Sequence, residues 1–261
     1  MPYAFLRGLS MFYKEVGQGP ALILVPGLGG DSRAFNPLLP FMRKHRVRLV
    51  APDPRGLGRS GGSTEDLGLD EMALDLVSLM DCLGIEAAAF LGVSLGALVV
   101  RSLAAKWPQK VSRIVLCSPP PPAASQGEEW RERLRELLSR TPLEEIMMRL
   151  LEMMVAPRYL EANRSTLQEL ASRYQIDERT RRVMIRQLEL WRGAGQQWSA
   201  LEVPSLILGG DQDVLAGPEV LKRISRSVQG SRLVIFEGVG HHLVLEAPCL
   251  VARELGRFLA P

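Results

Sequence analysis

Two serines in this chain lie in the pattern Gly-x-Ser-x-Gly, which is typical of a serine that acts as a nucleophile. Ser94 is central in residues 92–96, and Ser60 is central in residues 58–62. Such a nucleophile needs a buried strand leading into it and a helix leading out. An apolar run precedes Ser94 and a helical stretch follows it, whereas a polar loop follows Ser60. The context therefore favours Ser94 as the nucleophile and Ser60 as a loop residue.

A serine hydroxyl attacks a carbonyl poorly unless a base accepts its proton and an acid orients that base. The chain has three histidines. His45 lies in a basic run, which is typical of a solvated connector, whereas His241 and His242 follow Gly240. One member of this pair is the expected base, and the other is expected in the wall of a pocket.

Two aspartates are candidates for the acid. Asp211 and Asp213 directly follow an apolar run and the pair Gly209-Gly210. Either aspartate alone also fits a simple turn, because aspartate and glycine favour turns.

The elements that must position these residues follow an alternating order. Short apolar runs alternate with longer stretches of helical periodicity, which predicts an α/β fold with a mostly parallel sheet between two layers of helices. The expected strands are residues 3–6, 10–16, 21–25, 47–51, 87–93, 111–117, 205–208 and 232–236. The expected flanking helices are residues 69–83, 95–107, 218–227 and 248–259.

One long segment interrupts this alternation. Residues 119–199 contain a proline run and then three or four helical stretches, without a convincing strand. We therefore expect a helical cap at 119–199, inserted into a core domain formed by residues 1–118 and 200–261. Thr141 is the expected N-cap of one cap helix, and Asp177 is expected to open another.

Composition excludes several classes of protein. The net charge of +3 over 261 residues is spread along the chain, so no nucleic-acid partner is expected. The three cysteines have neither disulfide-framework nor metal-ligand spacing. The N-terminus does not fit a signal peptide, and the longest apolar stretch is shorter than the roughly 18 residues of a membrane span. We expect a cytoplasmic protein without a membrane span; the oligomeric state stays open, a homodimer included.

Four motifs in order resemble the α/β-hydrolase fold superfamily, in its serine esterase or lactonase-like branch with a helical cap. They are residues 92–96, residues 53–60 (Asp-Pro-Arg-Gly-Leu-Gly-Arg-Ser), residues 210–213 (Gly-Asp-Gln-Asp) and residues 240–248, where Gly-His is followed by Glu-Ala-Pro. The resemblance covers the whole chain and implies the α/β-hydrolase fold, with about eight strands. It assigns Ser94 as nucleophile, Asp213 as acid and His241 as base, in the chain order of that fold, with Asp211 and His242 as the alternatives.

The resemblance also implies an oxyanion hole, in which backbone N–H groups stabilise a developing negative charge. Its donors would be the N–H groups of Leu95 and of Leu28, which lies in a glycine-rich loop after the strand at 21–25. Pro26 stands in this loop where many members of the superfamily have histidine. The residues expected around the reacting end of the pocket are Gly27, Leu28, Leu95, Val214, Leu215, Val239, His242 and Met147.

These assignments imply transfer of an acyl group to water, without a metal or organic cofactor. The expected protein is a carboxylesterase of small or medium neutral esters, whose substrate is a small-molecule ester or lactone. Serine at position 94 argues against the dehalogenase and epoxide-hydrolase branches, which use aspartate there. The cap stretch 147–154, rich in methionine and leucine, is either an adaptable wall for acyl chains or simply the packing face of its helix.

Three alternatives remain open. The first is a pathway hydrolase, either an enol-lactonase or a carbon–carbon bond hydrolase of a carboxylated product; the latter would need a cap arginine that faces the pocket. The second is a carrier-linked esterase or thioesterase that docks an acidic acyl-carrier protein on the arginine-rich cap. The interleaved glutamates of the cap fit an ordinary solvated surface equally well. The third is a ligand receptor with slow turnover.

Overall fold

Eight strands form one sheet in the computed structural model, which describes residues 2–65, 67–121, 126–193, 198 and 201–260. The strand order is β1-β2-β4-β3-β5-β6-β7-β8; β2 pairs antiparallel with both β1 and β4, and the other pairs are parallel. The strands are β1 Tyr3–Leu6, β2 Leu9–Val16, β3 Ala21–Val25, β4 Arg48–Pro52, β5 Ala88–Val93, β6 Val111–Cys117, β7 Ser205–Gly210 and β8 Arg232–Phe236. All eight expected strands are confirmed, with ends within two residues of those predicted.

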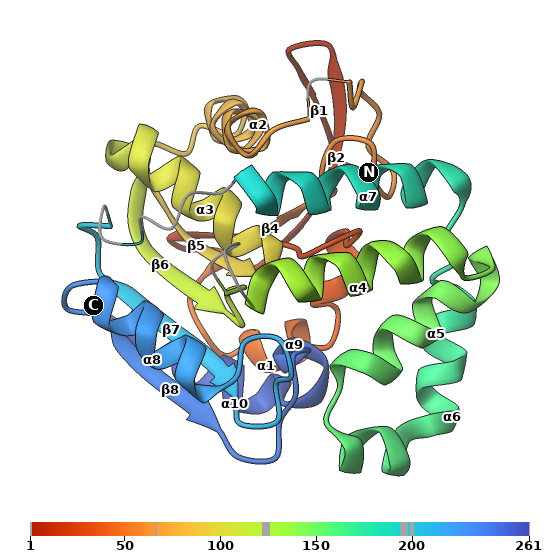
Figure 1. Cartoon of the computed structure of the whole chain (residues 1–261). Helices are drawn as coiled ribbons and strands as arrows, with labels where there is room; N and C mark the ends of the chain where they lie inside the picture. Colours follow the sequence, from red (N-terminus) through yellow and green to blue (C-terminus); the bar gives the residue numbers. More distant parts are fainter. Residues whose placement is uncertain (1, 66, 122–125, 194–197, 199–200, 261) are drawn as a thin grey trace.

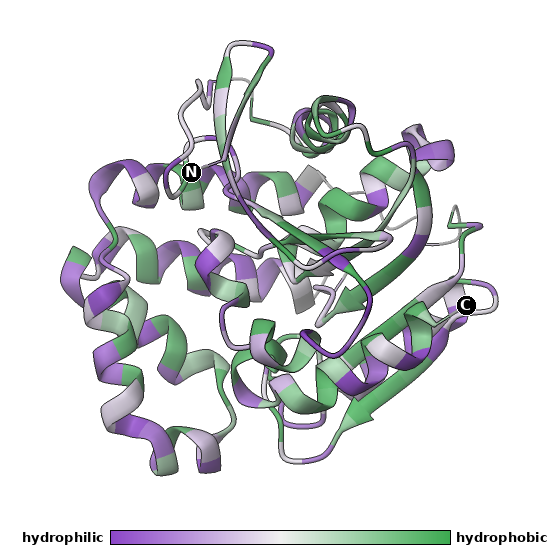
Figure 2. Cartoon of the chain, turned by 180° about the vertical axis from the view of Figure 1, so that it is seen from behind, coloured by the Kyte–Doolittle hydropathy of each residue, from purple (hydrophilic) through white to green (hydrophobic). Residues whose placement is uncertain are grey.

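The central strands are apolar on both sides because helices cover both faces of the sheet. In β3, Ile23 and Val25 pack into one apolar cluster, whereas Leu22 and Leu24 pack into another. Successive side chains of a strand point to opposite faces, so this alternation assigns one cluster to each side of the sheet. Figure 2 shows hydrophobic strands at the centre and hydrophilic residues along the outer helices.

Helices form a layer on each face of the sheet (Figure 1). The cluster that contains Ile23 includes side chains of α2 (Leu69–Cys82), α3 (Leu95–Lys106) and α8 (Pro218–Ser227), and the other cluster includes those of α1 (Leu39–Met42) and α10 (Pro248–Leu259). The short elements are η1 Ser32–Phe35, η2 Pro108–Lys110 and α9 Leu243–Glu246.

Among the described residues between β6 and β7, four α-helices occur, and we call them the helical insertion: α4 Gln126–Arg140, α5 Leu143–Met154, α6 Pro157–Arg173 and α7 Glu178–Gly193. In Figure 1, α4 and α7 run close to the sheet and α5 and α6 extend to one side. Asp177 opens α7 as expected, because its Oδ1 accepts a hydrogen bond from the Thr180 N–H at 2.7 Å. The prediction for Thr141 is wrong: the N-cap residue of α5 is Pro142, and no side chain caps that helix.

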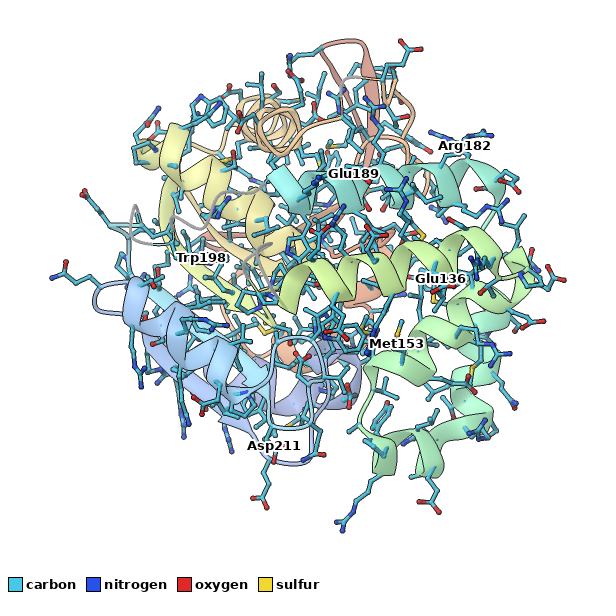
Figure 3. All side chains as sticks on the ribbon, viewed as in Figure 1. Glu136, Met153, Arg182, Glu189, Trp198 and Asp211 are labelled. Atoms are coloured by element: carbon cyan, nitrogen blue, oxygen red, sulfur yellow. The ribbon has the colours of Figure 1, made fainter. Side chains whose placement is uncertain are left out.

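The outer surface of the insertion is rich in ion pairs between arginine and glutamate. Arg135 pairs with Glu189 at 2.7 Å, and Arg140 pairs with Glu136 at 2.6 Å. Figure 3 shows Glu136 and Arg182 on the outer sides of α4 and α7. Such pairing is the pattern of an ordinary solvated face.

Parallel strands end at the same edge of the sheet, where open α/β sheets bind ligands. Ser94 follows β5 directly, Asp213 follows β7 by three residues, and His241 follows β8 by five. The fold therefore brings three distant parts of the sequence to one edge.

Candidate active site

Ser94 occupies a strained turn between β5 and α3. Its backbone has φ +50° and ψ −117°, a region that a residue with a side chain rarely adopts. The turn is tight because a Cβ at Gly96 would lie 2.3 Å from the Val25 carbonyl oxygen, and one at Gly92 would lie 2.6 Å from the Gly96 oxygen. Neighbouring backbone approaches so closely that both glycines of the motif are required, and Ser94 lies between them in this tight turn.

The second serine motif has a different role. Ser60 is buried; its Oγ accepts from the Phe12 N–H at 2.9 Å and donates to the Asp53 carbonyl at 2.7 Å. It fastens the loop after β4 to β2, as expected of a loop residue. His45 also lies apart from this site, since its ring packs close to Gly256 of α10.

Asp213 and His241 form a buried pair. The Nδ1 of His241 lies 2.9 Å and 3.0 Å from the two carboxylate oxygens of Asp213. Asp213 Oδ1 also accepts from the N–H groups of Leu215 at 2.9 Å and Ala216 at 2.8 Å. With Nδ1 bound to the carboxylate, the Nε2 edge of the ring is the one available to accept a proton.

The pair stabilises its own charged form. Burial raises the pKa of Asp213, but the neighbouring His241 and the two backbone hydrogen bonds outweigh burial, so the net pKa is lowered. Burial lowers the pKa of His241, but the charge and hydrogen bond of Asp213 and the charge of Glu246 outweigh it, so the net pKa is raised. The imidazole is therefore a stronger base than an ordinary histidine.

The two alternative residues are placed elsewhere. Asp211 Oδ1 accepts from the Gly238 N–H at 2.7 Å, in the outer loop that follows β7 (Figure 3). The ring of His242 lies 5.9 Å from that of His241, and burial together with the charge of His241 lowers the pKa of His242 to about 4. At neutral pH His242 is thus an uncharged pocket residue, and the geometry favours Asp213 and His241 as the acid and the base.

Glu246 holds the loop that carries His241, a contact that the sequence motif alone does not reveal. Its carboxylate accepts three backbone N–H groups, those of Gly240 at 2.8 Å, His242 at 3.0 Å and Ala156 at 2.9 Å. Ala156 belongs to the insertion, between α5 and α6. The His241 N–H itself donates to the Met154 carbonyl at 2.8 Å. The histidine loop is therefore bonded directly to the insertion.

The loop after β3 forms a hydrogen-bonded turn beside Ser94. The Gly30 N–H donates to the Gly27 carbonyl at 3.1 Å, with Leu28 and Gly29 in between. A Cβ at Gly27 would lie 3.3 Å from the Ser94 Cβ, so the loop passes the serine closely. Leu95 is the first residue of α3, and the N–H of such a residue has no carbonyl partner within its helix. The turn and the helix start are thus positioned to offer the two expected N–H donors.

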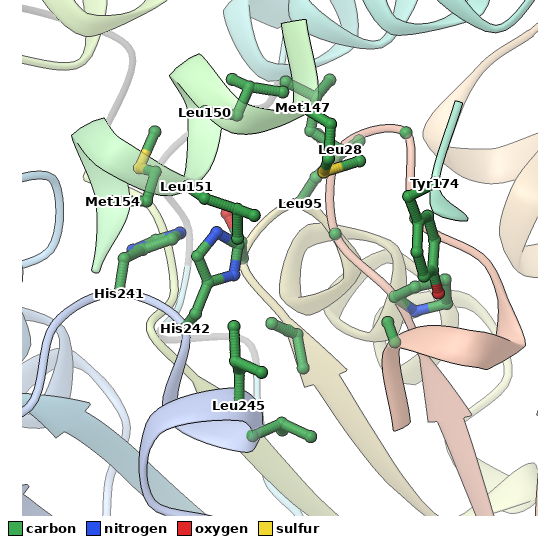
Figure 4. Close-up of a pocket in the computed structure, with 18 of the residues that line it drawn as sticks. Leu28, Leu95, Met147, Leu150, Leu151, Met154, Tyr174, His241, His242 and Leu245 are labelled. Atoms are coloured by element: carbon green, nitrogen blue, oxygen red, sulfur yellow. The ribbon is translucent and has the colours of Figure 1, made fainter. Parts of the chain in front are cut away.

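Ser94 and His241 line one apolar pocket of about 280 Å³ (Figure 4). Its lining includes the expected Gly27, Leu28, Leu95, Leu215, His242 and Met147. Val214 is 50% exposed and Val239 is buried in the core cluster on the α10 side, and neither lines the pocket. The prediction of these two as wall residues is therefore corrected.

One stripe of α5 forms the wall above the two histidines. Met147, Leu150, Leu151 and Met154 face the pocket, as Figure 4 shows, at the three- and four-residue spacing of one helix face. From α7, the lining includes Met184, Leu188 and Trp191. The insertion thus supplies most of the apolar side chains that a substrate would touch on that side.

The charged groups at the pocket are balanced. Arg33 lines the pocket, but its guanidinium is paired with Asp31 at 2.6 Å and lies 4.0 Å from the centre of the Tyr174 ring. Among the described residues, no arginine of the insertion lines the pocket. In the same part of the chain, no cluster of potential metal ligands occurs, and no helix has the length and apolar character of a bilayer span.

Comparisons with known proteins agree with this architecture. A model of the alpha/beta hydrolase family matches residues 22–254. The putative carbamate hydrolase RutD of Pseudomonas savastanoi is 28% identical over 250 residues, covering 92% of this chain and 93% of that protein. Mouse serine hydrolase BPHL is 35% identical over 116 residues, and this alignment spans 42% of the chain and only 40% of that protein.

Two solved structures share the fold over nearly the whole chain. The enol-lactonase of Burkholderia xenovorans LB400 has a TM-score of 0.86 at 22% identity, covering 99% of both chains. A thermophilic esterase of Thermogutta terrifontis has a TM-score of 0.85 at 21% identity, covering 99% of this chain and 97% of that one. The chain belongs to the alpha/beta hydrolase family. The protein is therefore a hydrolase with the α/β-hydrolase fold.

Proposed function

We propose that this protein is a serine carboxylesterase that cleaves small or medium neutral esters through an acyl-enzyme. The observation that supports the proposal is that Ser94 and His241 share one apolar pocket while His241 Nδ1 is bonded to the buried carboxylate of Asp213. Acyl transfer requires a serine and an oriented imidazole at one site, and these two residues line the same pocket.

In the first half of the reaction, Ser94 Oγ attacks the ester carbonyl and its proton passes to His241 Nε2. The carbonyl oxygen becomes an oxyanion, which the N–H groups of Leu28 and Leu95 stabilise. His241 then donates the proton to the departing alcohol as the carbon–oxygen bond breaks, which leaves Ser94 acylated. Asp213 holds the imidazole in one tautomer and stabilises its charged form.

In the second half, water replaces the alcohol. His241 takes a proton from the water as it attacks the acyl carbon, and the second oxyanion occupies the same two N–H groups. Collapse of this intermediate releases the carboxylic acid and returns the proton to Ser94 Oγ. The cycle consumes one ester and one water and gives one alcohol and one acid.

The charge balance of the pocket supports a neutral substrate. Arg33 is neutralised by Asp31, and His242 is uncharged at neutral pH because its pKa is about 4. An anionic substrate would need an unpaired cation to offset the desolvation of its charge. The carbon–carbon hydrolase alternative needs an arginine of the insertion at the pocket, and the described residues supply none there.

The test is steady-state hydrolysis of p-nitrophenyl esters from acetyl to palmitoyl, beside a lactone that carries a free carboxylate. We expect a maximum at short or medium chains and no turnover by Ser94→Ala. Rapid opening of the carboxylated lactone with negligible ester hydrolysis would overturn the proposed substrate class. Labelling of the wild type by a fluorophosphonate, but not of Ser94→Ala, reports on the nucleophile independently of the substrate.

A further inference from the structure

The helical insertion touches the oxyanion turn through one buried polar side chain. Gln187 of α7 is 1% exposed, and its Oε1 accepts a hydrogen bond from the Gly29 N–H at 2.8 Å. The two residues are 158 positions apart in the sequence. This bond therefore joins the loop after β3 to α7, two segments that are far apart in the sequence.

The bonded N–H belongs to the peptide that sets the conformation of the turn. Gly27 and Gly30 close the turn, so the Leu28–Gly29 peptide is its central one. Gly29 has φ +65°, while Leu28 is not among the residues with positive φ, and this combination defines a type II turn. A type I turn differs mainly by rotation of the central peptide, which would point the Gly29 N–H away from Gln187. The hydrogen bond is therefore specific for one of the two forms.

A second residue of α7 packs on the same glycine. A Cβ at Gly29 would lie 2.7 Å from the Cγ and Sδ atoms of Met184. Met184 and Gln187 are three residues apart, so they share one face of the helix. Helix α7 therefore makes an apolar contact with the turn through Met184 and a hydrogen bond with it through Gln187.

The helix that carries Gln187 makes two further hydrogen bonds to other segments of the chain. Arg179 Nη2 donates to the Ser60 carbonyl at 2.9 Å, and Trp191 Nε1 donates to the Pro121 carbonyl at 2.9 Å. These bonds lie on either side of Gln187 along α7. Helix α7 thus has contacts on both sides of Gln187 that do not involve the turn.

We propose that Gln187 is a positioning residue for the oxyanion hole: by its bond to the Gly29 N–H it holds the type II turn 27–30 in one place against α7, and so fixes the position of the turn's Leu28 N–H for the developing negative charge. This inference rests on the proposed acyl-transfer function. It makes the insertion a structural part of the reacting site as well as a wall for substrate. Because the oxyanion forms only during the reaction, loss of the bond should lower kcat far more than it changes KM.

The decisive variant is Gln187→Met, which keeps the length of the side chain but removes the acceptor. We expect kcat for the best p-nitrophenyl ester to fall at least about tenfold with KM within about threefold of wild type. The rate of fluorophosphonate labelling at Ser94 should fall in parallel, because the phosphonyl oxygen uses the same donors. Gln187→Glu keeps an acceptor oxygen in either protonation state and should stay closer to wild type than Gln187→Met.

Arg179→Met is the matched control, because it removes a bond between the same helix and the core that does not touch the turn. We expect it to keep near wild-type kcat and labelling rate. Equal losses in Arg179→Met and Gln187→Met, or wild-type rates in Gln187→Met, would overturn the proposal. Residue-resolved hydrogen exchange on the wild type requires no variant: protection of the Gly29 amide is expected, and exchange as fast as in an open loop would also overturn it.

The outcome for Gln187 can be separated from that of the proposed function. If the wild type is labelled by the fluorophosphonate but hydrolyses no neutral ester, the proposed substrate class fails. The labelling rates of the variants then still decide whether Gln187 positions the hole.

Discussion

The turn that carries Ser94 and the loop that carries His241 are held in different ways. The serine turn is fixed by crowding within the core, since Gly92 and Gly96 leave no room for a Cβ against neighbouring backbone. The histidine loop is instead held against the insertion. Its Gly240 and His242 N–H groups donate to the Glu246 carboxylate, which also accepts from the Ala156 N–H, and the His241 N–H donates to the Met154 carbonyl.

The helical insertion therefore contributes to the position of the His241 loop but not to that of the Ser94 turn. The close approaches that shape the serine turn come from β3, the residue after it and α3, and the Ser94 N–H donates to the Cys117 carbonyl of β6 at 2.9 Å, all within the core. Two of the bonds around the histidine loop involve backbone of the insertion, at Met154 and Ala156. The position of Ser94, the proposed nucleophile, therefore depends on the core, whereas the positions of His241, the proposed base, and of the proposed oxyanion turn depend on both core and insertion.

Loss of the nucleophile should have the largest effect. Ser94→Ala removes the attacking oxygen, so kcat should fall by about 10⁵-fold or more. Because the glycines that shape the turn are unchanged, the thermal unfolding midpoint should stay close to that of wild type. Steady-state kinetics and a melting curve test both halves of this prediction, and substantial residual ester turnover by the purified variant would contradict the mechanism.

Loss of Asp213, the proposed acid bonded to His241, should have the second-largest effect. Asp213→Asn removes the charge that holds the imidazole, and kcat should fall by about 10⁴-fold. The matched change Asp211→Asn affects an outer carboxylate bonded to the Gly238 N–H and should reduce kcat by less than about tenfold. The same esterase assay compares the two, and the reverse ranking would move the acid to Asp211.

Glu246→Gln tests the bonds between the histidine loop and the insertion. Weakening of hydrogen bonds to a charged acceptor should lower the free energy of unfolding by about 1–3 kcal/mol. Activity requires neutral His241, so kcat/KM falls as pH drops through the His241 pKa. The Glu246 charge contributes to raising that pKa, so its removal should lower the pKa and move the acid limb to lower pH. Denaturant unfolding and the pH profile are the measurements; a limb that moves to higher pH would refute this role of Glu246.

The pocket wall should give the smallest effect. Met147→Ala enlarges the pocket and leaves the loops 27–30 and 240–246 unchanged. The ratio of kcat/KM for longer acyl chains to that for shorter ones should therefore rise, by at most about tenfold. Met148 lies on the same helix outside the pocket lining, which makes Met148→Ala the control. A profile across p-nitrophenyl esters compares them, and identical profiles for both variants would show that α5 does not select the acyl group.

Much of the fold could be predicted from the sequence because the signals are local. Buried parallel strands form continuous apolar runs, and the strands fall within two residues of the expected bounds. The place of Ser94 between a strand and a helix could be predicted because the strand, the two glycines and the helix are contiguous in the chain. Met147 was expected at the pocket because the stretch 147–154 is rich in methionine and leucine, and it lies in the pocket lining.

The errors and omissions concern contacts that neighbouring residues do not encode. Val214 was placed in the pocket because it adjoins Asp213, but the N–H groups of Leu215 and Ala216 turn toward the Asp213 carboxylate and Val214 is left half exposed. Glu246 reaches Ala156 across 90 residues and Gln187 reaches Gly29 across 158. Nothing in the local sequence around either side chain indicates its partner.

The double attachment of the insertion has a consequence for protein engineering. Chimaeras that exchange the lid of one hydrolase for that of another treat it as an interchangeable specificity module. Here α7 is bonded to the turn at 27–30, and the α5–α6 junction is bonded to the loop at 240–246. The transferable unit is therefore the insertion together with those two loops, and a graft of the helices alone would exchange catalytic alignment along with substrate range.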